Sequence, residues 1–517
     1  MKNESRVHKS LLNAKVGIFY YFVFIILSFF SRKVFLDCLG PDFIGLSGTL
    51  VNILGMLSLA EMGVGAAVAY NLYKPIEQSD KNRIEELVSV FGFLYRRIGL
   101  FILFASLVIA CFIPLIFKNT TFSYTLIYFA FFTILSSSLF SYFINYRQIL
   151  LTADQRGYVV TIYLQGFMFV KVLLQIAVAY YTKNYYLWLI LEVIYGIGSC
   201  LVLNWKIKRT YPWLQANVSK GRKAYPQNKH IITFTKQVFV HKVKDFLLGQ
   251  SDQILIFAFV SLKMVAYYGN YALVVSRVSD AFNSALNSFN AGVGNLIAEG
   301  NKEHLVNVFW ELVSLRFIVA TFLIFSVYNL IEPFITLWLG SQFLLDRTIL
   351  ILLMFNIFIM QTRGAVDMFN SGFGHYADTW SAWVEGILNI TVTFATAPFL
   401  GIAGILLGKI VSLFFIVVLW KPCYLFHDGF HLSIWDYWSQ ILKYYVISFL
   451  WIVLGSYLFQ IVPINASLSF GYWALKSVVT VLPFIIIYIT ILYLTTEGTK
   501  NFACRIALMA KTKIRRR

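Results

Sequence analysis

Fourteen long apolar stretches, separated by mostly short polar connections, constrain this chain of 517 residues more than any other feature of its sequence. Hydrophobic residues make up 59% of the chain and charged residues only 13%, whereas soluble domains average about 25% charged residues. A helix of about 20 apolar residues is long enough to cross the hydrocarbon core of a bilayer. The sequence therefore predicts an all-α polytopic membrane protein with about 14 transmembrane helices.

The expected spans form two sets of six and a final pair. They lie near 14–36, 43–73, 91–117, 122–146, 158–181, 186–205, 238–260, 266–297, 305–331, 345–369, 378–397, 402–420, 437–460 and 471–495. A long polar segment separates the sixth span from the seventh. We therefore predict four parts: an N-terminal six-helix bundle (1–208), a basic cytoplasmic linker (209–236), a C-terminal six-helix bundle (237–430), and an additional helix pair with a basic tail (431–517).

The two sets of six spans resemble each other at a separation of about 220 residues. Residues 82–91 resemble 302–312, and residues 151–166 resemble 370–386 in the same order. Because each set holds an even number of spans, both sets have the same orientation in the membrane. This pattern is typical of parallel repeats related by an axis along the membrane normal.

The net charge of +19 comes mainly from Lys and Arg in the connections on one side of the membrane, including the 206–236 segment. The positive-inside rule places that side, and both termini, in the cytoplasm. This asymmetry explains the basic charge, so no nucleic-acid partner is expected. The five cysteines contain no C-x-x-C pair, and His427 and His431 lack a third ligand nearby, so we expect no metal site.

Ionisable residues inside the spans are costly in a bilayer and are treated as functional candidates. The second span carries one of them, Glu61, on a stripe with small and hydroxyl residues. The eighth span is the most polar of the set. Its polar residues include Asn270, Arg277, Asp280, Ser284 and Asn287.

Several stretches together resemble the bacterial polysaccharide flippases of the multidrug/oligosaccharidyl-lipid/polysaccharide exporter superfamily. They are Leu39-Gly40 with Gly45-Leu46, 52–76, Ser251 to Ile254, 292–300 and 401–426. The 52–76 stretch is the most specific. The chain departs from the family pattern at Lys409, where an uncharged residue is more usual.

The resemblance implies two six-helix bundles around a central cavity, plus two peripheral helices. It also implies a flippase that moves a polyprenyl-pyrophosphate-linked oligosaccharide, such as an O-antigen, capsule or exopolysaccharide unit, across the bacterial cytoplasmic membrane by alternating access. Such a protein is not an enzyme and needs no cofactor, although we expect a coupling H⁺ or Na⁺. The implied partners are the lipid-linked glycan, membrane lipids, a glycan polymerase and other polysaccharide assembly proteins.

Roles for the charged residues follow from the anionic character of a pyrophosphate, whose burial intramembrane Arg and Lys can offset. We expect Arg277, supported by Arg32 and Lys171, to contact the pyrophosphate. Asn270, Ser284 and Asn287 would line the same cavity. The carboxylates expected to couple an ion or to gate the path are Glu61, Asp252 and Asp280. Arg363 and Asp367 are expected to form a further pair in the cavity or between the lobes.

Three alternatives remain. A drug or organic-cation antiporter would share the fold, although its lumen should be acidic and aromatic. A membrane glycan polymerase or ligase would usually carry a large outer loop, and the outer connections here are short. A scaffold that only assembles glycan enzymes would tolerate substitution of the intramembrane charges.

Overall fold

The computed structural model describes residues 6–58, 64–118, 120–228, 251–286, 289–373 and 379–515. Within these ranges the regular elements are helices, without strands. Eleven of the described helices are long and apolar enough to cross a membrane. They coincide with eleven predicted spans, and the second, seventh and eighth predicted spans each contain residues outside the described ranges. The prediction of an all-α, multi-pass membrane protein is therefore confirmed.

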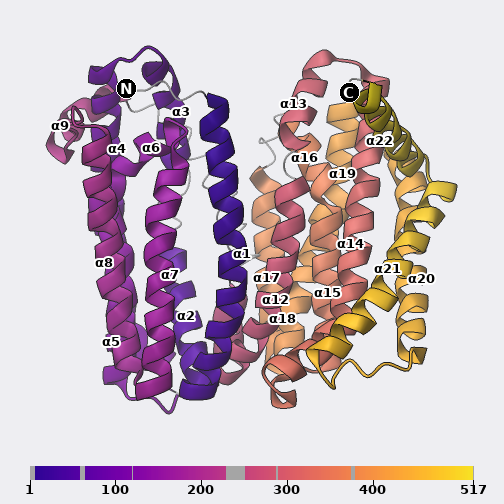
Figure 1. Cartoon of the computed structure of the whole chain (residues 1–517), viewed down its shortest axis with the longest axis horizontal. Helices are drawn as coiled ribbons and strands as arrows, with labels where there is room; N and C mark the ends of the chain where they lie inside the picture. The colour runs from indigo at the N-terminus through magenta and orange to yellow at the C-terminus, as the bar shows by residue number, and fades with distance from the viewer. Residues whose placement is uncertain are drawn as a thin grey trace. The chain divides into compact units, whose positions relative to one another are not determined.

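The chain forms two compact units, residues 1–266 and 267–517 (Figure 1). The helices of unit 1 are α1 (Arg6–Leu39), α2 (Pro41–Ser58), α3 (Val64–Glu77), α4 (Lys81–Ile116), α5 (Tyr124–Ile144), α6 (Gln148–Ala153), α7 (Gly157–Thr182), α8 (Tyr185–Thr210), α9 (Val218–Ala224) and α11 (Asp252–Phe259). Helix α12 (Leu262–Leu286) begins in unit 1 and continues into unit 2. The predicted domain boundaries at 208, 236 and 430 stay predictions.

The described helices of unit 2 that follow α12 are both long and short. They are α13 (Asn290–Glu299), α14 (Lys302–Trp338), α15 (Arg347–Thr362), α16 (Gly364–Gly372), α17 (Thr379–Leu400), α18 (Ile402–Leu413), α19 (Lys421–Tyr424), α20 (Ile434–Ile461), α21 (Phe470–Thr495) and α22 (Glu497–Arg515). Gly401, at a φ of +56°, makes the turn between α17 and α18. Gly404 lets the two helices approach, because a β-carbon there would lie 2.6 Å from the backbone nitrogen of Ala397.

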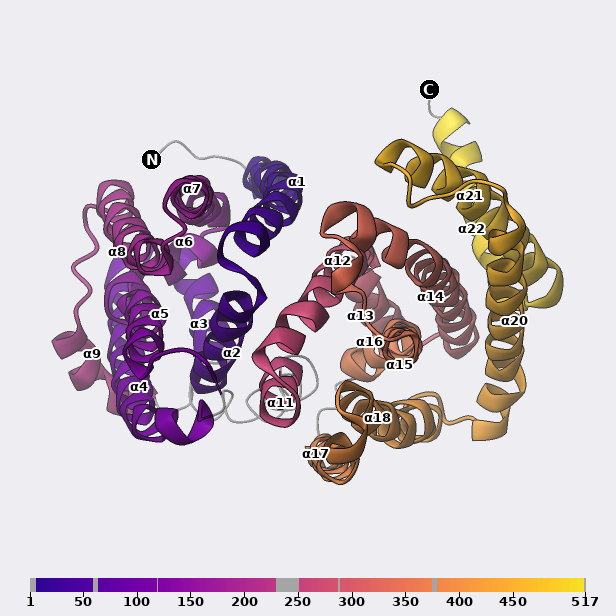
Figure 2. The ribbon, with the colours of Figure 1, turned by 90° about the horizontal axis from the view of Figure 1, so that it is seen from below.

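Helices α20, α21 and α22 lie along one side of α14 (Figure 2). The rings of Phe325 and Phe484 stack with centroids 3.7 Å apart, which joins α14 to α21. Nearer the start of α14, the Nε atom of Arg505 in α22 lies 3.0 Å from Oε2 of Glu311. Helices α21 and α22 therefore contact α14 at two different positions along its length.

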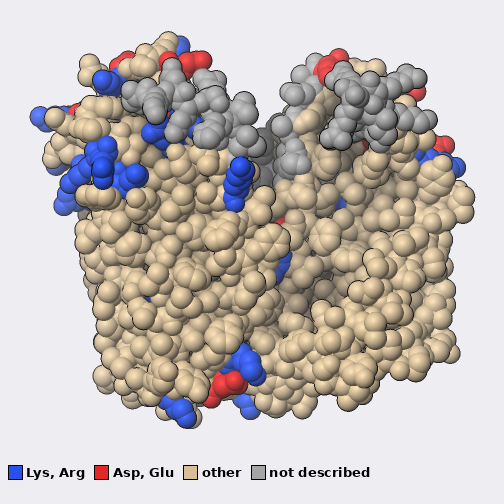
Figure 3. All heavy atoms as spheres, viewed as in Figure 1, with Lys and Arg blue, Asp and Glu red and all other residues tan. Residues whose placement is uncertain are grey.

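Large apolar side chains are exposed along the spans, as expected for a surface that faces lipid. Phe399 of α17 and Ile486 of α21 are 86% and 61% exposed. On the face drawn in Figure 3, Lys and Arg gather at the end of unit 1 that carries α9, and a broad belt with only a few charged residues follows. This distribution is that of a membrane protein with charged ends.

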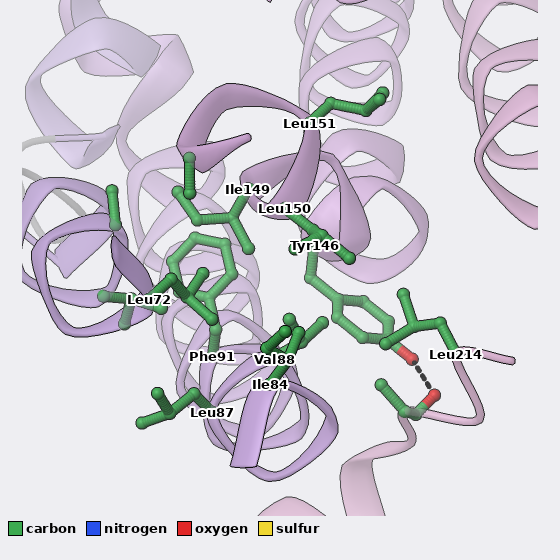
Figure 4. Close-up of a cluster of buried hydrophobic side chains, with 14 of the residues drawn as sticks. Leu72, Ile84, Leu87, Val88, Phe91, Tyr146, Ile149, Leu150, Leu151 and Leu214 are labelled. Atoms are coloured by element: carbon green, nitrogen blue, oxygen red, sulfur yellow. Dashed lines mark hydrogen bonds between the residues drawn. The ribbon is translucent and has the colours of Figure 1, made fainter. Parts of the chain in front are cut away.

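A cluster of buried apolar side chains in unit 1 joins α3, the start of α4 and α6 (Figure 4). Leu72 of α3, Val88 and Phe91 of α4, and Leu150 of α6 are almost fully buried in it. The Tyr146 hydroxyl at its edge donates to the carbonyl oxygen of Ala216, at 3.0 Å. This bond brings the segment after α8 onto the cluster.

Residues 211–228 of the predicted linker are folded against the start of α4. The backbone N–H of Asn217 donates to the Ser89 hydroxyl at 3.2 Å, and Arg83 donates to the side-chain oxygen of Asn228 at 2.8 Å. Gly221 of α9 packs so closely on α4 that a β-carbon there would collide with the Ser89 carbonyl oxygen. This half of the basic connection is therefore an ordered part of unit 1.

Asp154, between α6 and α7, joins α1 to this end of unit 1. Its carboxylate accepts from Lys9 Nζ and from the Tyr211 hydroxyl, both at 2.7 Å, and lies 3.1 Å from Arg156 Nε. Burial, followed by the charge of Asp154, raises the pKa of Tyr211. The phenol therefore stays protonated and can donate to Asp154 throughout the physiological pH range.

Gly221→Leu is expected to displace α9 from α4, because the new side chain has no space beside the Ser89 carbonyl. Limited proteolysis of the purified protein would detect this as faster cleavage within residues 211–228. Gly17→Leu in α1 is the matched control, since nothing lies within 4 Å of a β-carbon there. Equal cleavage rates in the two variants would contradict the tight packing.

Candidate functional site

Three polar side chains inside the spans of unit 1 meet between α7 and α8. Lys171 Nζ donates to Glu192 Oε1 at 2.6 Å, and Gln175 Nε2 donates to Glu192 Oε2 at 2.9 Å. These three residues form what we call the Glu192 cluster. The Lys171 and Glu192 side chains are only 16% and 21% exposed. Lys171 was predicted to contact substrate, and in this structure it contacts a carboxylate.

The turn between α7 and α8 sets the position of this cluster. Lys183 ends α7 in the left-handed region, and the Asn184 side chain accepts from two backbone N–H groups at the start of α8. The Tyr185 hydroxyl then lies 2.7 Å from the Ser47 hydroxyl of α2. The cluster is thus held by a capped helical hairpin that packs on α2.

Two other predicted site residues of unit 1 lie apart from the Glu192 cluster. Arg32 of α1 donates through Nη2 to the Ala266 carbonyl at 3.0 Å. Asp252 is 5% exposed and is the first residue of α11, where a carboxylate interacts favourably with the helix dipole. Beside it, Gln253 accepts from Asn52 of α2 at 2.9 Å. Arg32 and Asp252 therefore lie at helix contacts.

The predicted residues of α12 differ in exposure. Asn270 is buried, Arg277 is half-buried, and Asp280 and Ser284 are exposed. The Ser284 hydroxyl donates to the Asp280 carbonyl within the helix, at 2.8 Å. Glu61 and Asn287 lie outside the described residues, so the structure leaves their predicted roles as predictions.

Unit 2 contains a cluster of charges around Asp367, here called the Asp367 cluster. Arg363 Nε lies 3.1 Å from Asp367 Oδ2, and Lys421 Nζ lies 2.6 Å from Asp367 Oδ1. Arg363 and Asp367 thus form an ion pair, which joins residues one helical turn apart within unit 2. Arg316 of α14 interacts electrostatically with both residues. It donates to Asn283 of α12 at 3.0 Å.

The guanidinium group of Arg316 packs directly against Gly364. A β-carbon at Gly364 would lie 2.5 Å from Arg316 Nε. Arg316 and Arg363 lie within predicted spans, whereas Lys421 follows the predicted end of the twelfth span at residue 420. In the structure all three belong to long apolar helical segments, and the one that contains Lys421 continues to Phe430. The Asp367 cluster therefore brings three cations and one carboxylate together on helical segments that are apolar enough to cross a membrane.

The sequence reasoning missed several of these residues. Glu192 is visible as the one carboxylate of an apolar run, yet it was not considered as a partner of Lys171. Helix α17 carries a buried polar column at a spacing of four residues, which that periodicity could have revealed. Its members are Ser381, Glu385, Asn389 and Thr393. Among the described residues, no three His, Cys, Asp or Glu are grouped so that they could hold a metal ion.

Comparison with known proteins gives likenesses in structure only. No family model matches this sequence, and no curated protein matches it. A solved lipid II flippase, MurJ in an inward closed conformation, matches with a TM-score of 0.65 and 13% identity, over 93% of this chain and 99% of that chain.

Multidrug transporters of the MATE family also share the architecture. An inward-facing MATE transporter of the MOP superfamily matches with a TM-score of 0.57 and 13% identity, over 77% of this chain and 93% of that chain. A MATE transporter of Vibrio cholerae matches with a TM-score of 0.50 and 14% identity, over 82% of this chain and 99% of that chain. The chain therefore has the fold of these membrane transporters.

Proposed function

We propose that this chain, which has the fold of the MOP-superfamily transporters, is a flippase for a polyprenyl-pyrophosphate-linked oligosaccharide. It would move the glycan across the bacterial cytoplasmic membrane by exposing a polar path first to one face and then to the other. The movement would be coupled to H⁺ or Na⁺. Both termini would lie in the cytoplasm, as the positive-inside rule favours.

The likeness to the lipid II flippase carries this proposal. It extends over 93% of this chain, whereas the likeness to the inward-facing multidrug transporter extends over 77%. The flippase with that fold is named for a lipid-linked substrate. The Asp367 cluster supports an anionic substrate, because Arg316, Arg363 and Lys421 bring cations into the spans.

We assign the predicted roles as follows. Arg277 would contact the pyrophosphate, with Arg32 in support, and Asn270, Ser284 and Asn287 would line its path. The coupling or gating carboxylates would be Glu61, Asp252 and Asp280. Lys171 would serve either as a further phosphate contact or, through Glu192, as a link between α7 and α8. A glycan polymerase and other polysaccharide assembly proteins would be its protein partners.

Depletion of the protein in its host tests the flippase function. The expected result is accumulation of a lipid-linked oligosaccharide in the cytoplasmic leaflet and loss of the surface polysaccharide. Re-expression of the chain should reverse both effects. Normal surface polysaccharide with no accumulated precursor would contradict the proposal.

Arg277→Ala is expected to abolish most transport, because one charge-assisted contact to a phosphate contributes about 1.5–3 kcal/mol. The measurement is the level of surface polysaccharide at equal protein abundance in the membrane. Arg347→Ala is the control, since this exposed arginine lies at the start of α15. Wild-type polysaccharide in the Arg277 variant would remove Arg277 from the proposed path.

The second candidate function is a drug or organic-cation antiporter, which the likeness to MATE transporters favours. A susceptibility panel on a deletion strain separates the two functions. An antiporter predicts sensitivity to cationic drugs with normal surface polysaccharide. The flippase predicts the reverse.

A further inference from the structure

An open cavity of about 450 Å³ lies beside the connection between α20 and α21, at the end of unit 2 away from the C-terminus (Figure 1). It belongs to none of the polar clusters described above. The apolar part of its lining includes Pro333, Phe459 and Ile464. The polar part consists of Gln460, Asn465, Ser467 and Lys476.

Lys476 is the unusual member of this lining. Its side chain comes from the second turn of α21 and is only 8% exposed. Its nitrogen lies 4.2 Å above the centre of the Phe459 ring. Among the described residues no carboxylate forms an ion pair with it. A buried cation without a countercharge is strongly unfavourable, so this position favours an anion supplied from outside the chain.

The surroundings of the cavity indicate where that anion comes from. Phe470 and Tyr472 are half exposed beside it, and Trp473 donates its indole N–H to the Leu330 carbonyl at 3.0 Å. Aromatic residues of this kind collect where a helix passes from the hydrocarbon core to the headgroup layer. These aromatic side chains at the start of α21 favour a position of the cavity at the level of lipid headgroups.

We propose that Lys476 and this cavity bind the phosphate of a membrane lipid headgroup. Lysine provides a compact point charge for a phosphate oxygen. The amides of Gln460 and Asn465 and the hydroxyl of Ser467 can donate to the remaining oxygens, and the apolar part of the lining accommodates the start of the lipid chains. The site does not depend on the function proposed above, since it lies in the connection of the final helix pair.

Lipid binding to the purified full chain tests this site. After delipidation, phosphatidylglycerol is added, and bound lipids are counted by native mass spectrometry alongside thermal melting. Lys476→Met should bind one lipid fewer than the wild type, because its affinity for phosphatidylglycerol at this site should fall about tenfold. A fall of this size is the effect of losing one charge-assisted contact. Lys476→Arg should keep binding. Lys443→Met is the matched control, because this lysine is exposed on α20, nearer its other end.

Two further arms identify the ligand. Inorganic phosphate that stabilises the protein as much as phosphatidylglycerol would overturn the assignment to a lipid. Phosphatidylcholine that binds as tightly as phosphatidylglycerol would overturn the selectivity for an anion. Without lipid, Lys476→Met should melt no lower than the wild type, because it removes a buried charge. Undiminished phosphatidylglycerol binding by that variant would overturn the site.

Discussion

Glu192→Ala is expected to destabilise unit 1 by about 3 kcal/mol, because it leaves the Lys171 ammonium between α7 and α8 without its carboxylate. This value is the low end of the range for breaking a buried pair, since both side chains keep some exposure. The measurement is the thermal melting of the purified protein. Lys171→Met should also destabilise the protein, because it leaves the Glu192 carboxylate without its ammonium partner.

The double variant Lys171→Met/Glu192→Leu separates a structural role from a substrate role. Replacing both charges by apolar side chains should recover most of the lost stability, because no charge remains buried. If Lys171 only links the helices, the double variant should also transport. If it contacts the pyrophosphate, transport should stay low in a stable protein. A double variant as unstable as either single one would contradict the ion pair.

Asp367→Asn is the second change with a large expected effect. It removes the charge that both Arg363 and Lys421 approach, at 3.1 and 2.6 Å, and leaves these two cations and Arg316 to repel one another. We expect reduced transport and a loss of about 3 kcal/mol of stability, which is the low end of the range for breaking a buried charge pair because the Asp367 side chain is 31% exposed. Thermal melting and surface polysaccharide measure the two effects.

Asp346→Asn provides the control for this substitution. Asp346 is the exposed N-cap of α15, and its carboxylate accepts from the Thr348 N–H at 2.7 Å. Asparagine caps a helix about as well as aspartate, so this variant should melt at the temperature of the wild type. If Asp346→Asn and Asp367→Asn lowered the stability equally, Asp367 would not be the centre of a charge cluster.

The positions of the spans could be predicted because hydropathy over about 20 residues decides whether a helix enters a bilayer. Loops such as the one between α7 and α8 also follow from local signals, since Asn184 caps the next helix. These features depend on residues that are close in sequence. The helical, multi-pass character of the chain therefore needed no knowledge of its packing.

The pairing of charges could not be predicted in the same way. Lys171 and Glu192 are 21 positions apart, and Asp367 and Lys421 are 54 apart. Each pair depends on how two helices rotate against each other, which a hydropathy pattern does not determine. The folding of residues 211–228 could not be predicted for the same reason. It depends on contact between Gly221 and the backbone of α4 at Ser89.

The attachment of α22 to α14 has a practical consequence for anyone who shortens or tags this chain. Glu311 is 5% exposed and is paired with Arg505, and the hydroxyls of Ser314 and Thr499 lie 2.5 Å apart. A truncation just after α21 would remove both partners and leave a carboxylate buried against α14. The first part of α22 is therefore packed on α14 and should be kept, and a reporter should be joined after Arg515.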